Sequence, residues 1–432
     1  MRVCFYTLGC KVNLNETGAL EQMFRGAGFT IVPEGEEADV FVVNSCTVTN
    51  FGDQKSRKWL RRAKRENPGA VTVLTGCYPQ AFPEEAAEIA EADVVTGSGN
   101  RHAILADVQK VLNGEEERVV DIRPHEKGER FEELPMDKFA EHTRAFVKVE
   151  DGCNRRCAYC VIPRARGPVR SRDEASVLEE LHRLSDAGYK EVVLTAISLP
   201  SYGTDSGTSL VELIEKAAEV PGIERIRLGS LDPDMLHDED ILRMAGVKKL
   251  CPQFHLSLQS GCDKTLRAMR RPYTTAQYAD IAAKLREAFG AEKVSFTTDV
   301  IVGFPGETEE DFEASMAFVT GMQFLKVHVF PYSRREGTAA YDFPGQVPEH
   351  EKESRSRRMT AAVEEVRAAE VADMQGRTAS VLLETPLSNT LFTGYTKQYL
   401  PVLVSAPGHK TGDIVDVTLG AWDGKRCRAE SI

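Results

Sequence analysis

Between residues 144 and 330, strand-like runs alternate with helical runs, and this alternation restricts the possible fold more than any other feature of the chain. The six strand-like runs are 144–150, 191–196, 225–229, 253–258, 294–303 and 324–330. The helical runs between them are 173–187, 209–219, 234–245, 274–288 and 308–320. Six such units predict a parallel sheet curled into a partial (β/α)6 barrel, with ligands at the carboxyl ends of the strands.

The segments on either side have different patterns. Residues 1–118 alternate short β-rich runs with helical ones, which predicts an α/β domain built on a parallel sheet. Residues 119–138 are polar and charged, as expected of a linker, and the barrel domain is predicted over 139–369. Residues 370–432 contain five short strand-like runs separated by Pro, Gly and Asn, which predicts a small β-barrel of oligonucleotide-binding-like design.

Composition indicates a cytoplasmic protein whose cysteines stay reduced. The chain begins with only a short apolar run before Lys11, and no stretch approaches the roughly 20 apolar residues that cross a bilayer. Ten cysteines in a cytoplasmic protein are buried thiols or metal ligands rather than disulfides. The net charge of −12 excludes a uniformly basic surface, although local basic patches can still bind nucleic acid.

Three cysteines follow the first strand of the predicted barrel, at the spacing Cys153-x-x-x-Cys157-x-x-Cys160. Three thiolates this close can hold three irons of a [4Fe–4S] cluster and leave the fourth iron without a protein ligand. That open iron can chelate the amino and carboxylate groups of S-adenosylmethionine and position its sulfonium for one-electron cleavage. A zinc site is the alternative, but structural zinc prefers four ligands, often in paired CxxC elements, and the sequence has no second pair.

A second cysteine set is Cys10, Cys46 and Cys77, each of which follows a predicted strand of residues 1–118. In a parallel sheet all three would meet at the same carboxyl edge, where they could hold another cluster. Three unrelated buried loop thiols are the alternative. The cysteines expected to take no part in either cluster are Cys4, which is predicted to lie in the core, Cys251, Cys262 and Cys427.

The string DGCNRRCAYCVIPRARG, with an aromatic residue before its third cysteine, resembles the radical S-adenosylmethionine superfamily. Together with TLGCKVN, IRLGSLDP and FHLSLQSGCDKTL, it makes essentially the whole chain similar to the radical methylthiotransferases. Those enzymes have an N-terminal cluster domain, a radical domain and a C-terminal TRAM domain. The resemblance therefore implies two [4Fe–4S] clusters, S-adenosylmethionine as cofactor, and the transfer of a methylthio group.

Further cofactor contacts are expected around the barrel mouth. The resemblance implies that Tyr159 lies beside the adenine and that the glycine turn at 302–308 lies near the adenosine. Ser198 ends a run that stands where the superfamily has a GGEP-like motif, but the glutamate of that motif is absent, so only the general position carries over. Candidates at or near strand ends, each of which could also be an ordinary polar residue of a barrel mouth, are Arg227, Ser230, Gln259 and Asp299.

Within the family, the strings above are most similar to the branch that modifies N6-threonylcarbamoyladenosine beside the anticodon of tRNA. The isopentenyladenosine branch usually begins GCQMN and the ribosomal-protein branch LGCPKN, whereas this chain has GCKVN. The resemblance implies addition of the methylthio group at carbon 2 of the adenine. It also implies that the partners are the tRNA anticodon stem-loop and an electron donor such as flavodoxin or ferredoxin, with the chain acting as a monomer.

Two basic segments are candidates for contact with RNA. Residues 55–65, KSRKWLRRAKR, carry seven basic residues and no acid, which suits phosphate contacts, although a solvated helix face is the alternative. The candidate residues in this run are Lys55, Arg57, Lys58, Arg61 and Arg62. Residues 154–172 carry six arginines and no acid. Arg164 and Arg166 are candidates for binding the threonylcarbamoyl carboxylate, although these arginines could instead offset the charge of the cluster.

Two kinds of rival function follow from the same residues. A methylthiotransferase that acts on isopentenyladenosine, or on a ribosomal protein side chain, would use every one of the six cluster cysteines. A non-enzymatic iron–sulfur module that binds RNA or transfers electrons is the other rival. An open-iron motif followed by six βα units would have no purpose in such a module, which favours the enzyme.

Overall fold

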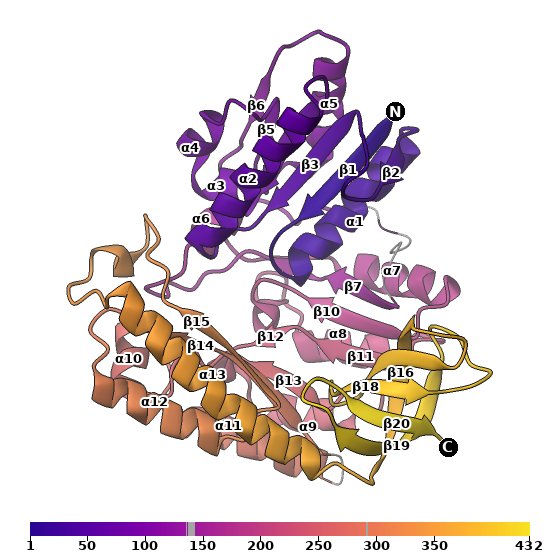
Figure 1. Cartoon of the computed structure of the whole chain (residues 1–432), viewed down its shortest axis with the longest axis vertical. Helices are drawn as coiled ribbons and strands as arrows, with labels where there is room; N and C mark the ends of the chain where they lie inside the picture. Colours follow the sequence, from indigo (N-terminus) through magenta and orange to yellow (C-terminus); the bar gives the residue numbers. More distant parts are fainter. Residues whose placement is uncertain (135, 137–142, 291–292) are drawn as a thin grey trace.

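A computed structural model of the chain describes residues 1–134, 136, 143–290 and 293–432 (Figure 1). It contains an N-terminal α/β domain, a central partial barrel and a small closed β-barrel, which confirms the predicted fold class. The predicted boundary between linker and barrel, at residues 138 and 139, lies outside the described residues. Within the described part of the chain, no helix is long and apolar enough to cross a membrane.

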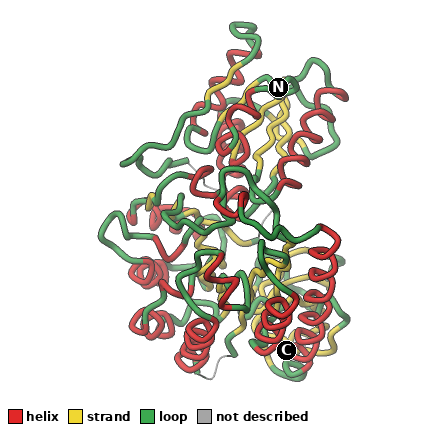
Figure 2. The backbone as a smooth tube through the Cα atoms, turned by 90° about the vertical axis from the view of Figure 1, so that its left-hand side faces the viewer, coloured by secondary structure: helices red, strands yellow, loops and turns green. Residues whose placement is uncertain are grey.

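The N-terminal domain is a six-stranded parallel sheet in the order β2-β1-β3-β4-β5-β6, with helices on both faces (Figure 2). Its strands are β1 (Arg2–Thr7), β2 (Thr30–Val32), β3 (Val40–Ser45), β4 (Val71–Gly76), β5 (Val94–Thr96) and β6 (Val119–Asp121). Its helices are α1 (Lys11–Gly26), α2 (Asn50–Glu66), α3 (Cys77–Ala81), α4 (Pro83–Ala87) and α5 (Ile104–Leu112). Alternate strand residues point to opposite faces, so Val42 packs with α1 and α5 while Phe41 packs with Trp59 of α2.

The central domain has two parallel sheets, in the orders β11-β10-β7 and β12-β13-β14-β15. Its strands are β7 (Arg144–Lys148), β8 (Glu150–Asp151), β9 (Arg170–Ser171), β10 (Glu191–Thr195), β11 (Arg225–Leu228), β12 (Ser230–Leu231), β13 (Gln253–Leu256), β14 (Ser295–Val302) and β15 (Lys326–Pro331). Its helices are α6 (Ile162–Arg166), α7 (Glu174–Asp186), α8 (Leu210–Glu219), α9 (Asp238–Gly246), α10 (Asp263–Ala268), α11 (Thr275–Phe289) and α12 (Glu309–Gly321). A backbone bridge between Ile226 and Leu250 joins the two sheets, and one apolar core fills the six-unit partial barrel.

Helix α13 (Glu349–Ala372) leads into a closed barrel in the order β16-β17-β18-β20-β19. The barrel strands are β16 (Thr378–Pro386), β17 (Leu391–Thr396), β18 (Pro401–Ser405), β19 (Ile414–Trp422) and β20 (Cys427–Ser431). Alternate residues such as Val402 and Val404 point into its core. The five strands that the turn pattern predicts are therefore present, and they close on themselves.

The structure differs from the predicted boundaries in three places. Helix α1 begins at Lys11, earlier than the helical run that the apolar pattern predicts over 17–28, because the first turn is capped through Cys10 and Asn13 rather than marked by apolar periodicity. Strand β6 extends the N-terminal sheet into the segment predicted as linker, since Val119 is buried and pairs with Val94. The predicted start of the last domain, residue 370, falls inside α13.

Candidate active site

The loop that carries Cys153, Cys157 and Cys160 connects β8 to α6 at the mouth of the partial barrel. The three thiols are partly buried and lie close enough to affect one another electrostatically. Burial raises the pKa of Cys153 to about 11 and that of Cys160 to about 12. These thiols therefore become thiolates only when a cation binds them, which is the behaviour of buried metal ligands.

The shape of this loop is fixed by close backbone contacts. Gly152 has a φ of +92°, and a Cβ there would lie 1.9 Å from the carbonyl oxygen of Pro168. The N–H of Cys153 donates to the carbonyl of Gly167 at 3.0 Å, and the N–H of Ala158 donates to that of Met269 at 2.9 Å. Only glycine fits at position 152, and the loop is held at both ends.

Cys10, Cys46 and Cys77 lie at the carboxyl ends of β1, β3 and β4, which are neighbours in the sheet. Burial, together with the nearby Cys77 and Cys10, raises the pKa of Cys46 to about 12. The thiol of Cys10 donates a hydrogen bond to Oδ1 of Asn13, with 3.3 Å between sulfur and oxygen. The three thiols thus meet at one edge of the sheet, as the sequence pattern indicates.

Among the residues that the structure describes, no three His, Cys, Asp or Glu side chains converge closely enough to hold a single metal ion. An iron–sulfur cubane is a larger body whose ligands lie further apart, and thiolates are the ligands that it takes. The donor type and number in each set fit such a cluster.

A buried network of charges lies between the two cysteine sets. Glu16 of α1 pairs with Arg101 at 3.0 Å and with Lys148 at 2.8 Å, and it also binds Arg166 of α6. Burial alone would raise the pKa of Glu16, but these three cations hold it below its usual value. The network joins the N-terminal domain to the barrel, because Glu16 and Arg101 belong to the first and Lys148 and Arg166 to the second.

Arg166 is not available to RNA, contrary to the prediction. Its side chain is fully buried, its two terminal nitrogens bind Glu16, and its Nε donates to Sγ of Cys77 at 3.1 Å. The two acids that neutralise it, Glu16 and Asp151, are supplied by segments outside the acid-free run 154–172. Arg166 therefore bridges the second cysteine set and the barrel.

Two adjoining cavities open next to the cysteine sets. The smaller one, of about 190 Å³, is lined by Tyr159, Cys160, Gln259 and Asp299. The larger one, of about 540 Å³, is lined by Cys10, Ser230 and Asp299 among others. Because Asp299 and Phe330 line both, the cavities share a wall. Tyr159, Ser230, Gln259 and Asp299, which the sequence singles out separately, thus line two neighbouring cavities.

Gln259 adopts a strained backbone conformation in this region. Its φ is +70°, a value that few residues other than glycine adopt. The conformation is fixed because its N–H donates to the carbonyl of Asp299 at 2.9 Å, and its own carbonyl accepts from the N–H of Ile301 at 2.8 Å. Strain that is held in place this way is common at binding sites.

Two of the predicted cofactor contacts lie elsewhere. Ser198 is buried behind the barrel mouth, where its N–H donates to Glu150 at 2.8 Å, and it lines neither cavity. The guanidinium of Arg227 is bound by Glu191 at 3.0 Å and by the carbonyl of Lys397 in the C-terminal barrel at 2.9 Å. Arg227 therefore fixes the C-terminal barrel to the central domain.

The larger cavity has walls from all three parts of the chain, including residues that the sequence pattern did not single out. Lys11 comes from the N-terminal domain, Arg367 from α13, and Tyr395 and Tyr399 from the C-terminal barrel. The two tyrosine rings are stacked, with centroids 4.5 Å apart. For Lys11 the sequence signal was its place beside Cys10 in the string GCKVN, whereas nothing in the sequence links the tyrosines to the barrel mouth.

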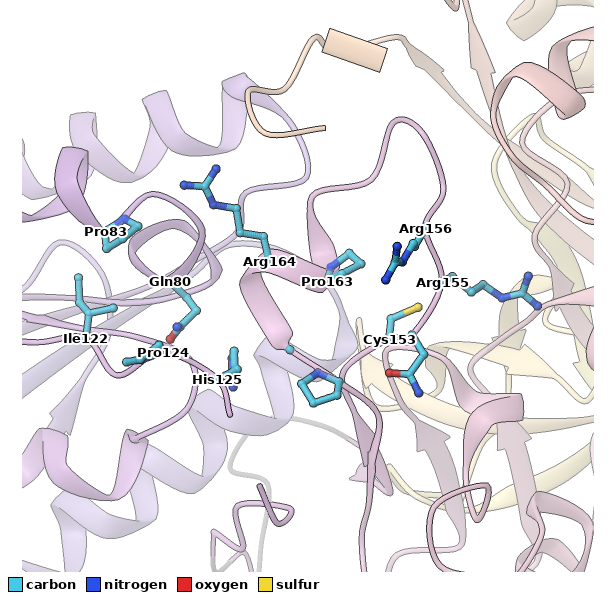
Figure 3. Close-up of a pocket in the computed structure, with 13 residues that line it drawn as sticks. Gln80, Pro83, Ile122, Pro124, His125, Cys153, Arg155, Arg156, Pro163 and Arg164 are labelled. Carbon is cyan, nitrogen blue, oxygen red and sulfur yellow. The ribbon is translucent and has the colours of Figure 1, made fainter. Parts of the chain in front are cut away.

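A third cavity, of about 570 Å³, is lined in part by Cys153 (Figure 3). Arg155, Arg156 and Arg164 line it together with Gln80 of the N-terminal domain. Arg155 is paired with Asp234 at 2.7 Å, whereas Arg156 and Arg164 have no acidic partner in the described part of the chain. The cavity is therefore basic where it approaches the cysteine loop.

The basic run 55–65 lies on α2, and acids from neighbouring segments neutralise much of its charge. Arg57 lies 3.8 Å from Glu85, Arg61 pairs with Glu91 at 3.1 Å, and Arg62 pairs with Glu66 at 3.1 Å. Within the described residues, Lys55 and Lys58 have no acidic partner. These two lysines carry the unneutralised charge among the five predicted RNA contacts of this helix.

Comparisons with known proteins agree with this arrangement. A model of the "Radical SAM superfamily" matches residues 147–319, and one of the "Uncharacterized protein family UPF0004" matches residues 2–97. Threonylcarbamoyladenosine tRNA methylthiotransferase MtaB of Bacillus subtilis (strain 168) is 38% identical over 423 residues, which cover 96% of this chain and 93% of that protein. The chain belongs to the radical S-adenosylmethionine methylthiotransferase family. It is therefore an enzyme, and its family implies a [4Fe–4S] cluster and S-adenosylmethionine as cofactors.

Methylthiotransferases with a different named product are almost as similar. The tRNA-2-methylthio-N(6)-dimethylallyladenosine synthase of Clostridium novyi (strain NT) is 34% identical over 423 residues, covering 96% of this chain and 92% of that protein. Among solved structures, the radical S-adenosylmethionine methyltransferase TsrM from Kitasatospora setae superposes with a TM-score of 0.58 at 14% identity, over 79% of this chain and 74% of that one. The structural likeness supports the fold alone.

Proposed function

We propose that this methylthiotransferase acts on tRNA and adds a methylthio group to carbon 2 of N6-threonylcarbamoyladenosine beside the anticodon. The observation that best supports this is the cavity of about 540 Å³, in which Cys10 of one cysteine set faces the same space as Ser230 and Asp299 of the barrel mouth. An adenine bound there would lie between the two cysteine sets. The string GCKVN, with Lys11 in the cavity wall, favours the threonylcarbamoyl substrate over the isopentenyl one.

The six cysteines would hold two clusters. Cys153, Cys157 and Cys160 would bind the one that takes up S-adenosylmethionine, and Cys10, Cys46 and Cys77 a second one. When bound, these groups supply the electron that cleaves S-adenosylmethionine and the sulfur that is transferred.

Two arginines donate hydrogen bonds to the cysteine sets, one to each. Arg271 donates to Sγ of Cys157 at 3.4 Å, and Arg166 donates to Sγ of Cys77 at 3.1 Å. Arg166 acts to lower the pKa of Cys77, but burial outweighs it and the pKa stays raised. Such donors suit sulfurs that carry negative charge when a cluster binds them.

The smaller cavity would take the adenosine part of S-adenosylmethionine. Tyr159 and Ile301 give it apolar surface, while Gln259 and Asp299 offer polar groups. Asp299 and Phe330 also line the larger cavity, so the cofactor and the substrate base would lie on either side of these two residues. The protein walls on both sides would exclude water from the reacting atoms.

An external reductant, such as flavodoxin or ferredoxin, completes the proposal. The cavity in Figure 3 supports it, because Cys153 lines it and none of its lining residues lines the substrate cavity. Arg156 and Arg164 give that side a positive charge, which attracts an acidic partner.

The proposal is tested with anaerobically reconstituted enzyme, S-adenosylmethionine and reductant. Anticodon stem-loops with N6-threonylcarbamoyladenosine or N6-isopentenyladenosine are supplied in equal amounts with ribosomal protein, and the products are identified by mass spectrometry. We expect the methylthio group on the threonylcarbamoyl nucleoside. A methylthio group only on isopentenyladenosine, or only on the protein, would move the assignment to that substrate.

A further inference from the structure

The cavity of about 540 Å³ is lined by more cations than anions. Lys11, Lys326 and Arg367 line it, and Asp299 is the one carboxylate among its lining residues in the described part of the chain. Asp299 lies 3.5 Å from Nε2 of His255. The cavity thus has an excess of positive charge and suits an anionic ligand.

Lys11 is the cation that lacks a partner most clearly. The guanidinium groups of Arg144 and Arg227 lie near it. Those two arginines are neutralised, Arg144 by Glu384 at 2.7 Å and Arg227 by Glu191 at 3.0 Å. No acid of the described chain lies within ion-pair distance of Lys11. An ammonium in such surroundings is incompletely compensated until an anion binds.

The position of Lys11, at the N-terminus of α1, is also unfavourable for the stability of that helix. Lys11 is the first residue of α1, and the first turn of that helix contains no acid. A cation at a helix N-terminus is repelled by the helix dipole, and the free N–H groups there favour an anion. Helix stability therefore gives no reason for a lysine at this position, whereas anion binding does.

The C-terminal barrel adds an aromatic wall next to Lys11. The stacked rings of Tyr395 and Tyr399 line the cavity, and the guanidinium of Arg227 lies 4.8 Å from the centre of the Tyr399 ring. Tyr399 has a φ of +67°, and its N–H donates to the carbonyl of Thr396 at 3.0 Å. A flat aromatic base fits beside such a pair, with its acidic substituent toward Lys11.

We propose that Lys11 binds the carboxylate on the substrate base, so that the cavity selects an adenosine whose N6 substituent ends in an acid. This inference rests on the proposed function and names the residue that determines its specificity. Arg367 lies in the wall of the same cavity; its Nη1 pairs with Glu364 at 3.4 Å, and its Nε is buried without a hydrogen-bond partner in the described chain. Asp299 and the paired tyrosines then hold the base rather than its substituent.

The test measures binding without turnover. Anaerobically reconstituted enzyme, without reductant, is titrated with fluorescent anticodon stem-loops that carry N6-threonylcarbamoyladenosine, its carboxyl methyl ester or unmodified adenosine. Wild type should bind the acid about tenfold more tightly than the ester, as one charge-assisted hydrogen bond allows. Lys11→Gln should abolish this ratio and leave the affinity for the ester unchanged, whereas Lys11→Arg should keep most of it.

Lys110→Gln is the matched control, because Lys110 is an exposed residue of α5 that lines none of the three cavities. Iron content and melting temperature establish that each variant is folded. The comparison between the acid and its methyl ester is made in wild type and does not depend on any variant. If Lys11→Gln keeps the ratio, Lys11 does not bind the carboxylate. If it weakens all three RNAs equally, Lys11 binds a phosphate instead. Either result overturns the inference but leaves the proposed function in place, because wild type would still prefer the acid. Equal binding of all three RNAs by wild type would contradict both.

Discussion

At the scale of single residues, buried charges hold the two cysteine sets in place. Glu16, Arg101, Lys148 and Arg166 are all almost fully buried, and each depends on the others for neutralisation. Removal of one member of a buried pair leaves an uncompensated charge, which costs about 3–5 kcal/mol of folding free energy. Nothing in the sequence around Glu16 indicates this, because a glutamate inside a helical run is usually exposed to solvent.

Arg166→Met tests this network. We expect a loss of about 3–5 kcal/mol in the free energy of unfolding, together with reduced iron at the second cysteine set, because Cys77 loses the N–H of Arg166. Arg164→Met is the control, since Arg164 is exposed two residues away, and it should change stability by less than about 0.5 kcal/mol. Chemical denaturation and iron analysis measure both, and equal behaviour of the two variants would exclude a structural role for the network.

Glu307 provides a test that depends on pH. It is buried in the turn after β14, where it accepts from the N–H of Gly303 at 2.8 Å and from Arg355 at 2.9 Å. Burial outweighs these two contacts and raises the pKa of Glu307 to about 7. Below its unfolded pKa the carboxyl is protonated in both states. Between the unfolded value of 4.5 and about 7, the carboxyl ionises in the unfolded state but stays protonated in the folded state, so a rising pH favours unfolding.

Stability should therefore fall between about pH 4.5 and pH 7 and level off above, by on the order of 3 kcal/mol from this group. Glu307→Gln does not titrate and should lose this part of the pH dependence. The exposed Glu310→Gln should follow wild type. Urea denaturation at several pH values measures the difference, and parallel profiles for wild type and Glu307→Gln would show that the group does not titrate in this range.

At the scale of elements, the sequence predicts long strands and helices well. It predicts very short strands, and a helix start that depends on capping, poorly. The strands of the partial barrel and of the C-terminal barrel lie within two or three residues of their predicted bounds, because their apolar and turn patterns are strong. The three-residue strands β2, β5 and β6 are too short to give a pattern. The basic run 55–65 lies on α2, but its sequence alone does not show how much of its charge is neutralised. The acids that neutralise it come from other segments, such as Glu85 and Glu91.

The contribution of α2 to RNA binding should therefore be small and restricted to two lysines. Lys55→Gln with Lys58→Gln should weaken stem-loop binding and lower the slope of log K against log salt by about 1 for each phosphate that the variant no longer binds. Arg61→Gln with Arg62→Gln, which removes two charges that are already paired, should have little effect. Fluorescence titration over a range of salt concentrations distinguishes the pairs, and equal effects of both double variants would contradict the assignment.

At the scale of the whole molecule, three bodies enclose one cavity. The C-terminal barrel is fixed to the central domain by Arg227, which binds the carbonyl of Lys397, and by Ser295, which donates to the carbonyl of Gln398 at 2.6 Å. These contacts bring Tyr399 to the mouth of the partial barrel. The six cysteines, Tyr159, Gln259 and Asp299 could be predicted because they follow strands or stand in a local motif. The tyrosine wall could not, because it depends on how separate domains pack.

Cysteine variants test the separate roles of the two cysteine sets. Cys153→Ala should abolish both the formation of 5′-deoxyadenosine and the modification of the RNA. Cys46→Ala should leave cofactor cleavage in place but stop methylthio insertion, because Cys46 belongs to the other set. Cys262→Ala, outside both sets, should resemble wild type. Chromatography of the cofactor products and mass spectrometry of the RNA measure the two activities, and survival of insertion in Cys46→Ala would refute the second cluster.

The most direct test of the proposed function is nucleoside mass spectrometry of tRNA from cells that lack this gene and from the same cells after complementation. We predict that 2-methylthio-N6-threonylcarbamoyladenosine disappears in the deletion and returns with the wild-type gene but not with Cys153→Ala. Unchanged levels of this nucleoside, with loss of the 2-methylthio form of isopentenyladenosine or of a ribosomal-protein modification instead, would contradict the proposed substrate.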